Sequence, residues 1–198
     1  MVADLTGVGR MRGNKFRGSD RFRRLAVRLR ANDGSAIIEF AFIAPIFFLL
    51  LFAILEIGVI FFAQSTLQHA TDNLGRMIRT GQVQGAALTQ SAVRQLVCND
   101  IAGLIPCDTN LYVDVESFSG FGGVIFSPPV DPNGNIIPLN NFQTGTACSV
   151  VLVRTFYAWT VFTPLLTPFL VNVAGNNHLL YASAAFRNEP FTTGISGC

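Results

Sequence analysis

The sequence predicts an α+β protein in which a long N-terminal membrane-spanning helix continues into a small domain with a short antiparallel sheet. The apolar run from Ala36 to Ala63 extends over about 42 Å as a helix, and about 20 residues are enough to cross a bilayer core. Apolar residues keep helical spacing beyond this run, to about residue 80. After Cys107 the spacing changes to the alternation of a strand. The chain of 198 residues has room for this helix and one modest domain.

The N-terminal tail is basic, with nine Lys and Arg against three acids in residues 1–34, and the rest of the chain has five Arg against nine acids. Because basic residues beside a span favour the cytoplasmic side, we expect a cytoplasmic leader (1–34), a transmembrane helix (35–63) and a periplasmic α+β domain (64–198). Residues 1–20 have the composition of a disordered segment, and residues 21–32 have the spacing of a surface helix. Because no aromatic and basic interleaving continues beyond the tail, a nucleic-acid partner is disfavoured.

The remaining elements follow from local patterns. The long helix is expected to end near Gly81, since glycine is typical of helix C-termini, and a second helix is expected at about residues 86–97. Residues 119–146 are rich in Gly, Asn and Pro, which indicates an exposed loop. The proline-rich segment 163–170 favours an apolar loop or a short helix over a central strand. Period-two spacing or a high density of β-formers predicts three strands, at 111–116, 147–159 and 178–187.

Four cysteines lie C-terminal to the span: Cys98, Cys107, Cys148 and Cys198. On the oxidising side of a membrane an even number of cysteines favours disulfides, and four allow three connectivities. The short separation favours Cys98–Cys107, which leaves Cys148–Cys198. Buried free thiols are the alternative. A metal site is disfavoured, because there is no CxxC pair and neither histidine has ligand spacing.

Two acids lie inside the apolar run, and both are expensive within a bilayer unless they find a partner. Glu39 lies about 16 Å from the middle of the run, close enough to the edge of the hydrocarbon core to reach water. Glu56 is expected roughly 10 Å inside the outer boundary, where an interhelical contact is favoured over incidental exposure. Pro45 is either a tolerated residue of a membrane helix or a point at which the helix bends on packing.

The stretch from Gly34 to Pro45 reads Gly, Ser, Ala, Ile, Ile, Glu, Phe, Ala, Phe, Ile, Ala, Pro. It resembles the prepilin-peptidase junction of type IV pilin-like proteins and, more closely, the N-terminal signature of the TadE-like family of the tight-adherence (Flp) pilus apparatus. Glu56 matches the second glutamate of that signature, and blocks between residues 149 and 190 are similar to the closing blocks of the family. The resemblance implies a bacterial single-pass inner-membrane protein of type IV pilin-like fold.

The resemblance also implies that a prepilin peptidase cleaves after Gly34 and makes Ser35 the first residue. The freed amine of Ser35 would then pair with Glu39 of a neighbouring subunit. The implied function is that of a minor pseudopilin, whose partners are other pilins, pseudopilins and tight-adherence assembly proteins. The alternative is a signal-anchored periplasmic binding module unrelated to pili. No catalytic motif is present, so we expect neither an enzyme nor a cofactor or metal.

Overall fold

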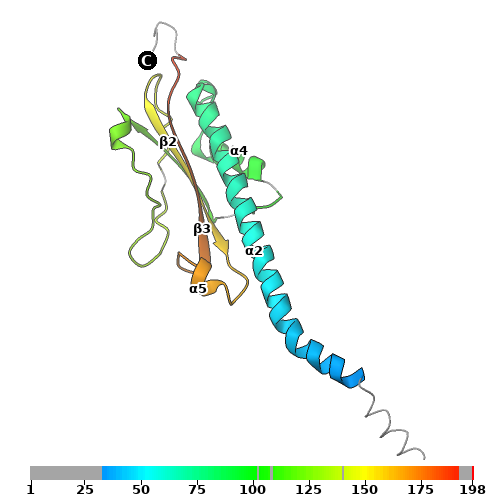
Figure 1. The fold of residues 1–198 in the computed structure, drawn as a ribbon. Coiled ribbons are helices and arrows are strands. Elements are labelled where there is room, and N and C mark those ends of the chain that lie inside the picture. The colour runs from blue at the N-terminus through cyan, green and yellow to red at the C-terminus, as the bar shows by residue number, and fades with distance from the viewer. Residues whose placement is uncertain (1–32, 102, 108, 140, 192–197) are drawn as a thin grey trace, which may run out of the picture. The chain divides into compact units, whose positions relative to one another are not determined.

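The computed structural model describes residues 33–101, 103–107, 109–139, 141–191 and 198. The expected disordered segment 1–20 and the expected surface helix 21–32 lie outside these residues. In chain order the elements, labelled as in Figure 1, are α2 (Asp33–Arg79), α3 (Gln82–Gly85), α4 (Gln90–Ile101), β1 (Leu111–Phe118), the 3-10 helix η1 (Phe121–Gly123), β2 (Val150–Thr160), α5 (Thr167–Leu170) and β3 (Asn177–Arg187). The predicted α+β class is confirmed, with a long apolar helix first and a small sheet after it.

The chain divides into two compact units, Met1–Phe48 and Leu49–Cys198, and the division falls within α2. In the first unit the described residues 33–48 are all helical, and Pro45 lies inside the helix. Their side chains from Gly34 onward are exposed except for that of Ala44, which is partly buried. The sheet and its core belong entirely to the second unit.

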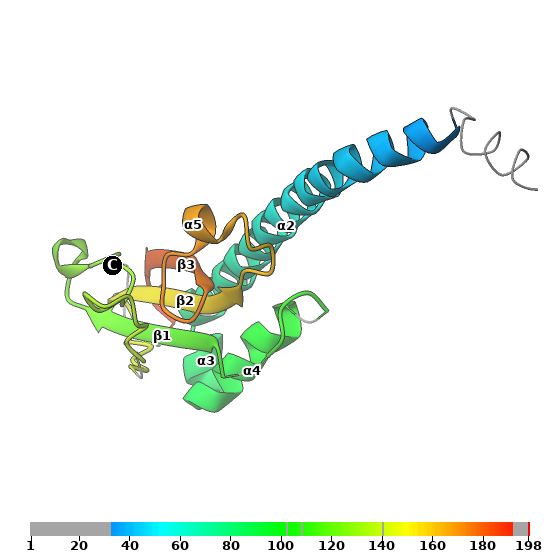
Figure 2. The same cartoon turned by 90° about the horizontal axis from the view of Figure 1, so that it is seen from below.

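The sheet has three antiparallel strands in the order β1-β2-β3. In its register Asp114 of β1 lies opposite Arg154 of β2, which lies opposite Ser183 of β3. Residues 49–79 of α2 run along one face of the sheet (Figure 1), and α3 and α4 lie beside them (Figure 2). The β1–β2 connection lies over the other face, where Val130 and Ile136 pack against Phe156. Both faces of this small sheet are therefore covered.

The core side of α2 presents apolar residues at steps of three or four, as a helix packed along one stripe requires. Leu67 and Ile78 have no exposed surface, and burying one such side chain stabilises a fold by about 1.5–3 kcal/mol. The stripe begins at Ile60, one residue of the core cluster earlier than the expected start at Ala63. The domain core thus begins inside the segment 35–63 that was assigned to the membrane span.

The end of α2 is set by Gly81, as expected. Its φ is 75°, and its N–H donates to the carbonyl of Ile78 (3.0 Å), so the left-handed residue stops the helix. A side chain could not be added at this position without moving the Phe191 ring, because a Cβ would lie 2.5 Å from it.

The second helix lies later in the chain than expected. It occupies Gln90–Ile101 instead of residues 86–97, and the short helix α3 precedes it. The hydroxyl of Thr89 accepts a hydrogen bond from the N–H of Ala92 (3.3 Å), which is the arrangement of an N-cap. Ala87 has a φ of 49°, a left-handed conformation that no helix can pass through. The apolar spacing predicted the helix, and the cap sets where it begins.

Two contacts hold α2 to β3 at separate levels. The amide of Gln64 donates to the carbonyl of Tyr181 (2.7 Å) and accepts from the N–H of the same residue (3.2 Å). Near the other end of both elements, the N–H of Glu189 donates to the carbonyl of Arg79 (2.9 Å), and their side chains form an ion pair (3.4 Å). Within the second unit, α2 and β3 therefore run in the same direction.

Candidate functional site

The expected processing junction lies in the first turn of α2. Gly34 has open space around it, since a Cβ built there would meet no atom within 4 Å. Ser35 and Glu39 are one helical turn apart and both exposed, and the Ser35 hydroxyl donates to the Glu39 carboxylate (2.8 Å). Among the described residues no cation pairs with Glu39. The junction is accessible, and the carboxylate of Glu39 is held by a neutral partner of its own chain.

The apolar surface of α2 before the core stripe remains largely uncovered by the described part of the chain. Large side chains along it are exposed, among them Ile37, Phe42, Phe47, Phe52 and Leu55. Soluble proteins rarely expose so many large apolar side chains together. Within the described residues, α2 alone is long and apolar enough to cross a membrane. This supports the expected single-pass anchoring.

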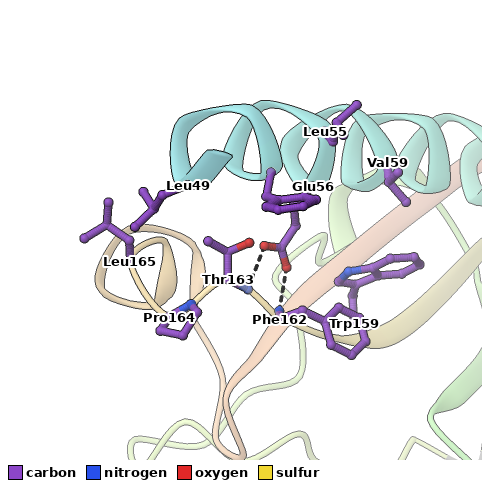
Figure 3. Close-up of a pocket in the computed structure, with 10 residues that line it drawn as sticks. Leu49, Leu55, Glu56, Val59, Trp159, Phe162, Thr163, Pro164 and Leu165 are labelled. Atoms are coloured by element: carbon purple, nitrogen blue, oxygen red, sulfur yellow. Dashed lines mark hydrogen bonds between the residues drawn. The ribbon is translucent and has the colours of Figure 1, made fainter. Parts of the chain in front are cut away.

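Glu56 has partners that the sequence analysis did not anticipate. Its carboxylate turns toward the β2–α5 loop (Figure 3) and accepts hydrogen bonds from the backbone N–H groups of Phe162 (2.6 Å) and Thr163 (2.9 Å). One oxygen serves each donor. Both oxygens therefore have partners within the chain, and the role that the structure gives Glu56 is to hold this loop. The interhelical contact expected for Glu56 stays a prediction.

An apolar groove of about 850 Å³ surrounds this contact. The α2 side is lined by Leu49, Phe52, Leu55, Glu56 and Val59, and the facing side by Trp159 and the loop residues Phe162, Thr163, Pro164 and Leu165 (Figure 3). Glu56 is the one charged residue among these lining residues. The groove is therefore apolar apart from one acid, Glu56, whose carboxylate already accepts hydrogen bonds from the loop backbone.

A second charged cluster lies in the sheet. Nε and Nη2 of Arg154 donate to one oxygen of Asp114 (3.0 and 2.7 Å), and Nη2 also donates to Glu116 (2.6 Å). Nη1 donates to the carbonyl of Ile125 (3.2 Å), which ties the β1–β2 connection to the sheet. The side chain of Asp114 is fully buried, and its burial, opposed by Arg154, raises the pKa of this carboxyl. This cluster has a structural role.

Sequence reasoning missed this burial. Side chains alternate along β1, so Val113 and Val115 lie on one face of the sheet and Asp114 lies on the other. An acid at such a position ordinarily indicates that its face is exposed to solvent. The other face is covered here by the β1–β2 connection, so Asp114 is buried as well. An arginine inside the apolar strand around Arg154 was the available signal, because a buried cation needs an acidic partner.

The structure joins both preferred cysteine pairs. Cys98 and Cys107 are linked with their Cα atoms 5.4 Å apart, and Cys148 and Cys198 with theirs 5.3 Å apart. The first bridge fastens the end of α4 to the segment before β1. The second fastens Cys198 to the residue two positions before β2. The bridges therefore stabilise the domain and are not part of a site.

The described residues offer no other clear chemical site. No group of three His, Cys, Asp or Glu side chains among them could hold a metal ion. Nδ1 of His178 lies 2.6 Å from the carbonyl of Leu170, so this histidine has a structural partner. His69 lines an open polar groove beside Asp72 and Asp100.

The comparison with protein families agrees with the residues at the start of α2. Residues 34–76 match the family model described as TadE-like protein. The matched segment contains Gly34, Ser35, Glu39, Pro45 and Glu56, whereas the similar blocks between residues 149 and 190 lie beyond it. No curated protein and no solved structure matches the chain. The resemblance to the TadE-like family is thus confirmed for the segment from Gly34 to Arg76, and this family suggests a role related to pilus assembly.

Proposed function

We propose that the chain is a minor pseudopilin or pilus-assembly protein of a tight-adherence (Flp) pilus apparatus, and that it acts through contacts between subunits. The observation that carries the proposal is the coincidence of three features in one segment. The family match covers residues 34–76, the uncovered apolar surface of α2 lies within it, and the accessible junction at Gly34 stands at its start. A family of structural pilus-assembly components also fits a domain in which we identify no catalytic site.

The proposed topology places the N-terminus in the cytoplasm, residues 35–63 of α2 in the inner membrane, and the domain of residues 64–198, with the rest of α2, in the periplasm. The excess of basic residues before Gly34 favours this orientation. The two disulfides support it as well, because disulfides persist on the oxidising side of the membrane.

In the proposed processing step a prepilin peptidase hydrolyses the peptide bond between Gly34 and Ser35. The space around Gly34 supports this step, because the backbone there is not shielded by side chains of the described chain. Cleavage would create a cationic amine on Ser35, which already lies one turn from Glu39. In an assembled structure Glu39 would take the amine of a neighbouring subunit as its partner, since a buried carboxylate needs a cation.

N-terminal sequencing of the protein extracted from the membranes of its native host tests the processing step. The proposal predicts a chain that begins at Ser35. Finding full-length protein alone would contradict processing.

The second test compares two variants for pilus assembly by electron microscopy. Glu39→Ala removes the carboxylate and is expected to impair assembly. Ser35→Ala is the matched control, because it removes the hydroxyl that contacts Glu39 but keeps the freed amine, and normal assembly is expected. Normal pili in the Glu39→Ala variant, together with an uncleaved chain, would leave the signal-anchored periplasmic module as the explanation.

A further inference from the structure

We infer that the exposed apolar residues from Phe162 to Phe169, in the segment Val161–Asn176 that connects β2 to β3, are embedded in the membrane leaflet on the side of the sheet domain. This segment is called the β2–β3 connection below, and its proposed partner is the acyl-chain region of the lipid. The inference requires α2 to cross a membrane but does not depend on a role in pili. It adds a second membrane contact to a chain in which α2 is the candidate span.

The first argument is depth. The β2–β3 connection faces α2 across the groove, whose lining on α2 extends from Leu49 to Val59. These residues belong to the apolar run, and Leu49 lies about 21 Å of helix before Ala63. A loop that lies beside Leu49 and Glu56 must share their environment. If α2 is in lipid at these positions, Phe162 to Leu165 are in lipid too.

The second argument is the surface that the connection presents. Phe162, Leu165 and Phe169 have 75%, 55% and 82% of their surface exposed. No Asp, Glu, Lys or Arg occurs from Val161 to Asn176. An exposed apolar patch of this kind marks an interaction surface. This patch lies beside exposed apolar residues of α2 in the same unit, among them Phe52 and Leu55. Lipid is the one partner that covers both surfaces without a further protein.

The third argument is the backbone. In a bilayer core no water is available, so N–H groups must find partners within the protein. The N–H groups of Phe162 and Thr163 donate to Glu56, and that of Val161 donates to the carbonyl of Asn176. The N–H groups of Leu166, Phe169, Leu170 and Val171 donate to carbonyls within the same loop and α5. Pro164 and Pro168 have no N–H to satisfy. Most N–H groups from Val161 to Val171 therefore have partners within the protein, which lowers the cost of placing this part of the connection in lipid.

The chain has a single tryptophan, Trp159, and the experiment first removes it with the substitution Trp159→Phe. One reporter tryptophan is then introduced into the full-length protein at each of three exposed phenylalanines. Phe169→Trp reports on the β2–β3 connection. Phe47→Trp reports on α2. Phe121→Trp, in η1, is the matched control because it lies at the other end of the sheet. η1 follows Phe118 of β1, which pairs with Val150 at the start of β2, whereas the connection follows Thr160 at the end of β2.

Each protein is reconstituted in vesicles of phosphatidylethanolamine and phosphatidylglycerol, with and without lipid brominated along its acyl chains. Bromine quenches tryptophan fluorescence on contact, and aqueous iodide quenches tryptophan in water. Tryptophan at position 169 is expected to emit at shorter wavelength than tryptophan at 121 and to lose most of its emission to brominated lipid. Tryptophan at 121 is expected to be quenched by iodide and to be insensitive to the brominated lipid.

Two outcomes would overturn the inference while α2 still spans the membrane. In both, tryptophan at 47 is quenched by brominated lipid. In the first, tryptophan at 169 behaves like that at 121 and is in water. In the second, it is shielded from both quenchers, which would mean that protein, such as a second copy of the chain, covers the connection. If tryptophan at 47 is also insensitive to brominated lipid, α2 is not in the membrane and the inference fails with it.

Discussion

The carboxylate of Glu56 accepts a hydrogen bond of 2.6 Å from the backbone N–H of Phe162, a residue 106 positions later in the chain. The contact joins the apolar helix to the far end of the sheet. It gives a direct structural reason for an acid at this point of the helix, because the two N–H groups that Glu56 accepts from would otherwise need water.

The first prediction concerns this contact. Glu56→Ala removes the acceptor of two backbone N–H groups, one in an exposed and one in a part-buried contact, and a donor that loses its partner away from water costs about 1–3 kcal/mol. We expect the β2–α5 loop to open more often, and amide exchange of a peptide that contains Phe162 and Thr163 to become about 10- to 100-fold faster. Hydrogen–deuterium exchange followed by mass spectrometry, on the protein in detergent, measures this. Glu39→Ala is the control on the same helix and should leave that peptide unchanged. Equal exchange rates in all three proteins would contradict the assigned role of Glu56.

The second prediction concerns the buried cluster of Arg154, Asp114 and Glu116. Arg154→Met leaves the fully buried carboxylate of Asp114 without its cation, which is expected to lower the free energy of unfolding by about 3–5 kcal/mol. Adding Asp114→Leu removes the unpaired charge and should restore most of that loss. Urea unfolding followed by circular dichroism gives both values. A double variant as unstable as the single one would show that the cluster acts through something other than the buried charge.

The third prediction is the pH dependence of the same variant. Burial raises the pKa of Asp114 even beside Arg154, and loss of the guanidinium removes an interaction that opposes this rise. A carboxyl whose folded-state pKa lies above its unfolded value contributes most to stability when it is protonated, and this contribution is lost as the pH rises through the folded-state pKa. The instability of Arg154→Met should therefore shrink as the pH falls from neutral toward the ordinary pKa of aspartic acid. Unfolding midpoints of wild type and variant across this range measure it, and a constant difference between them would contradict it.

The fourth prediction compares the two disulfides by loop length. The Cys148–Cys198 bridge closes a loop with a sequence separation of 50, and the Cys98–Cys107 bridge one with a separation of 9. In the chain-entropy model these loops correspond to about 4 and about 2.5 kcal/mol. Replacing Cys148 and Cys198 by serine should therefore lower the unfolding free energy more than replacing Cys98 and Cys107 by serine. Denaturant unfolding of the two double variants checks the order. A reversed order would mean that native contacts outweigh loop entropy.

The fifth prediction concerns the end of α2. Gly81→Ala places a side chain on a residue with a φ of 75° and forces the Phe191 ring to move, so a loss of about 1–2 kcal/mol is expected. Gly85→Ala is the matched control, since a Cβ there meets no atom within 4 Å. That change should be neutral or slightly stabilising. Thermal unfolding of the two proteins distinguishes them, and equal effects would contradict the proposed reason for the glycine.

The elements of this fold could be predicted because their signals are local. The apolar run and the spacing after it gave α2, and β-rich segments gave three strands within a few residues of their observed ends. The start of α4 was placed four residues too early, because the cap at Thr89 decides it and the apolar spacing does not. Apart from the Cys148–Cys198 pair, interactions between distant segments could not be predicted. The burial of Asp114 depends on its register opposite Arg154, and the partner of Glu56 depends on where the end of the sheet meets the helix.

Gln64 has a consequence for how copies of this chain could associate. β3 is an edge strand, and edge strands offer free backbone groups on which another chain can extend the sheet. The side chain of Gln64 occupies both the N–H and the carbonyl of Tyr181 on that edge. A second β3 could not pair across this point without displacing α2. Strand addition is therefore blocked at this point of β3, whereas β1, the other edge of the sheet, is not protected by this contact.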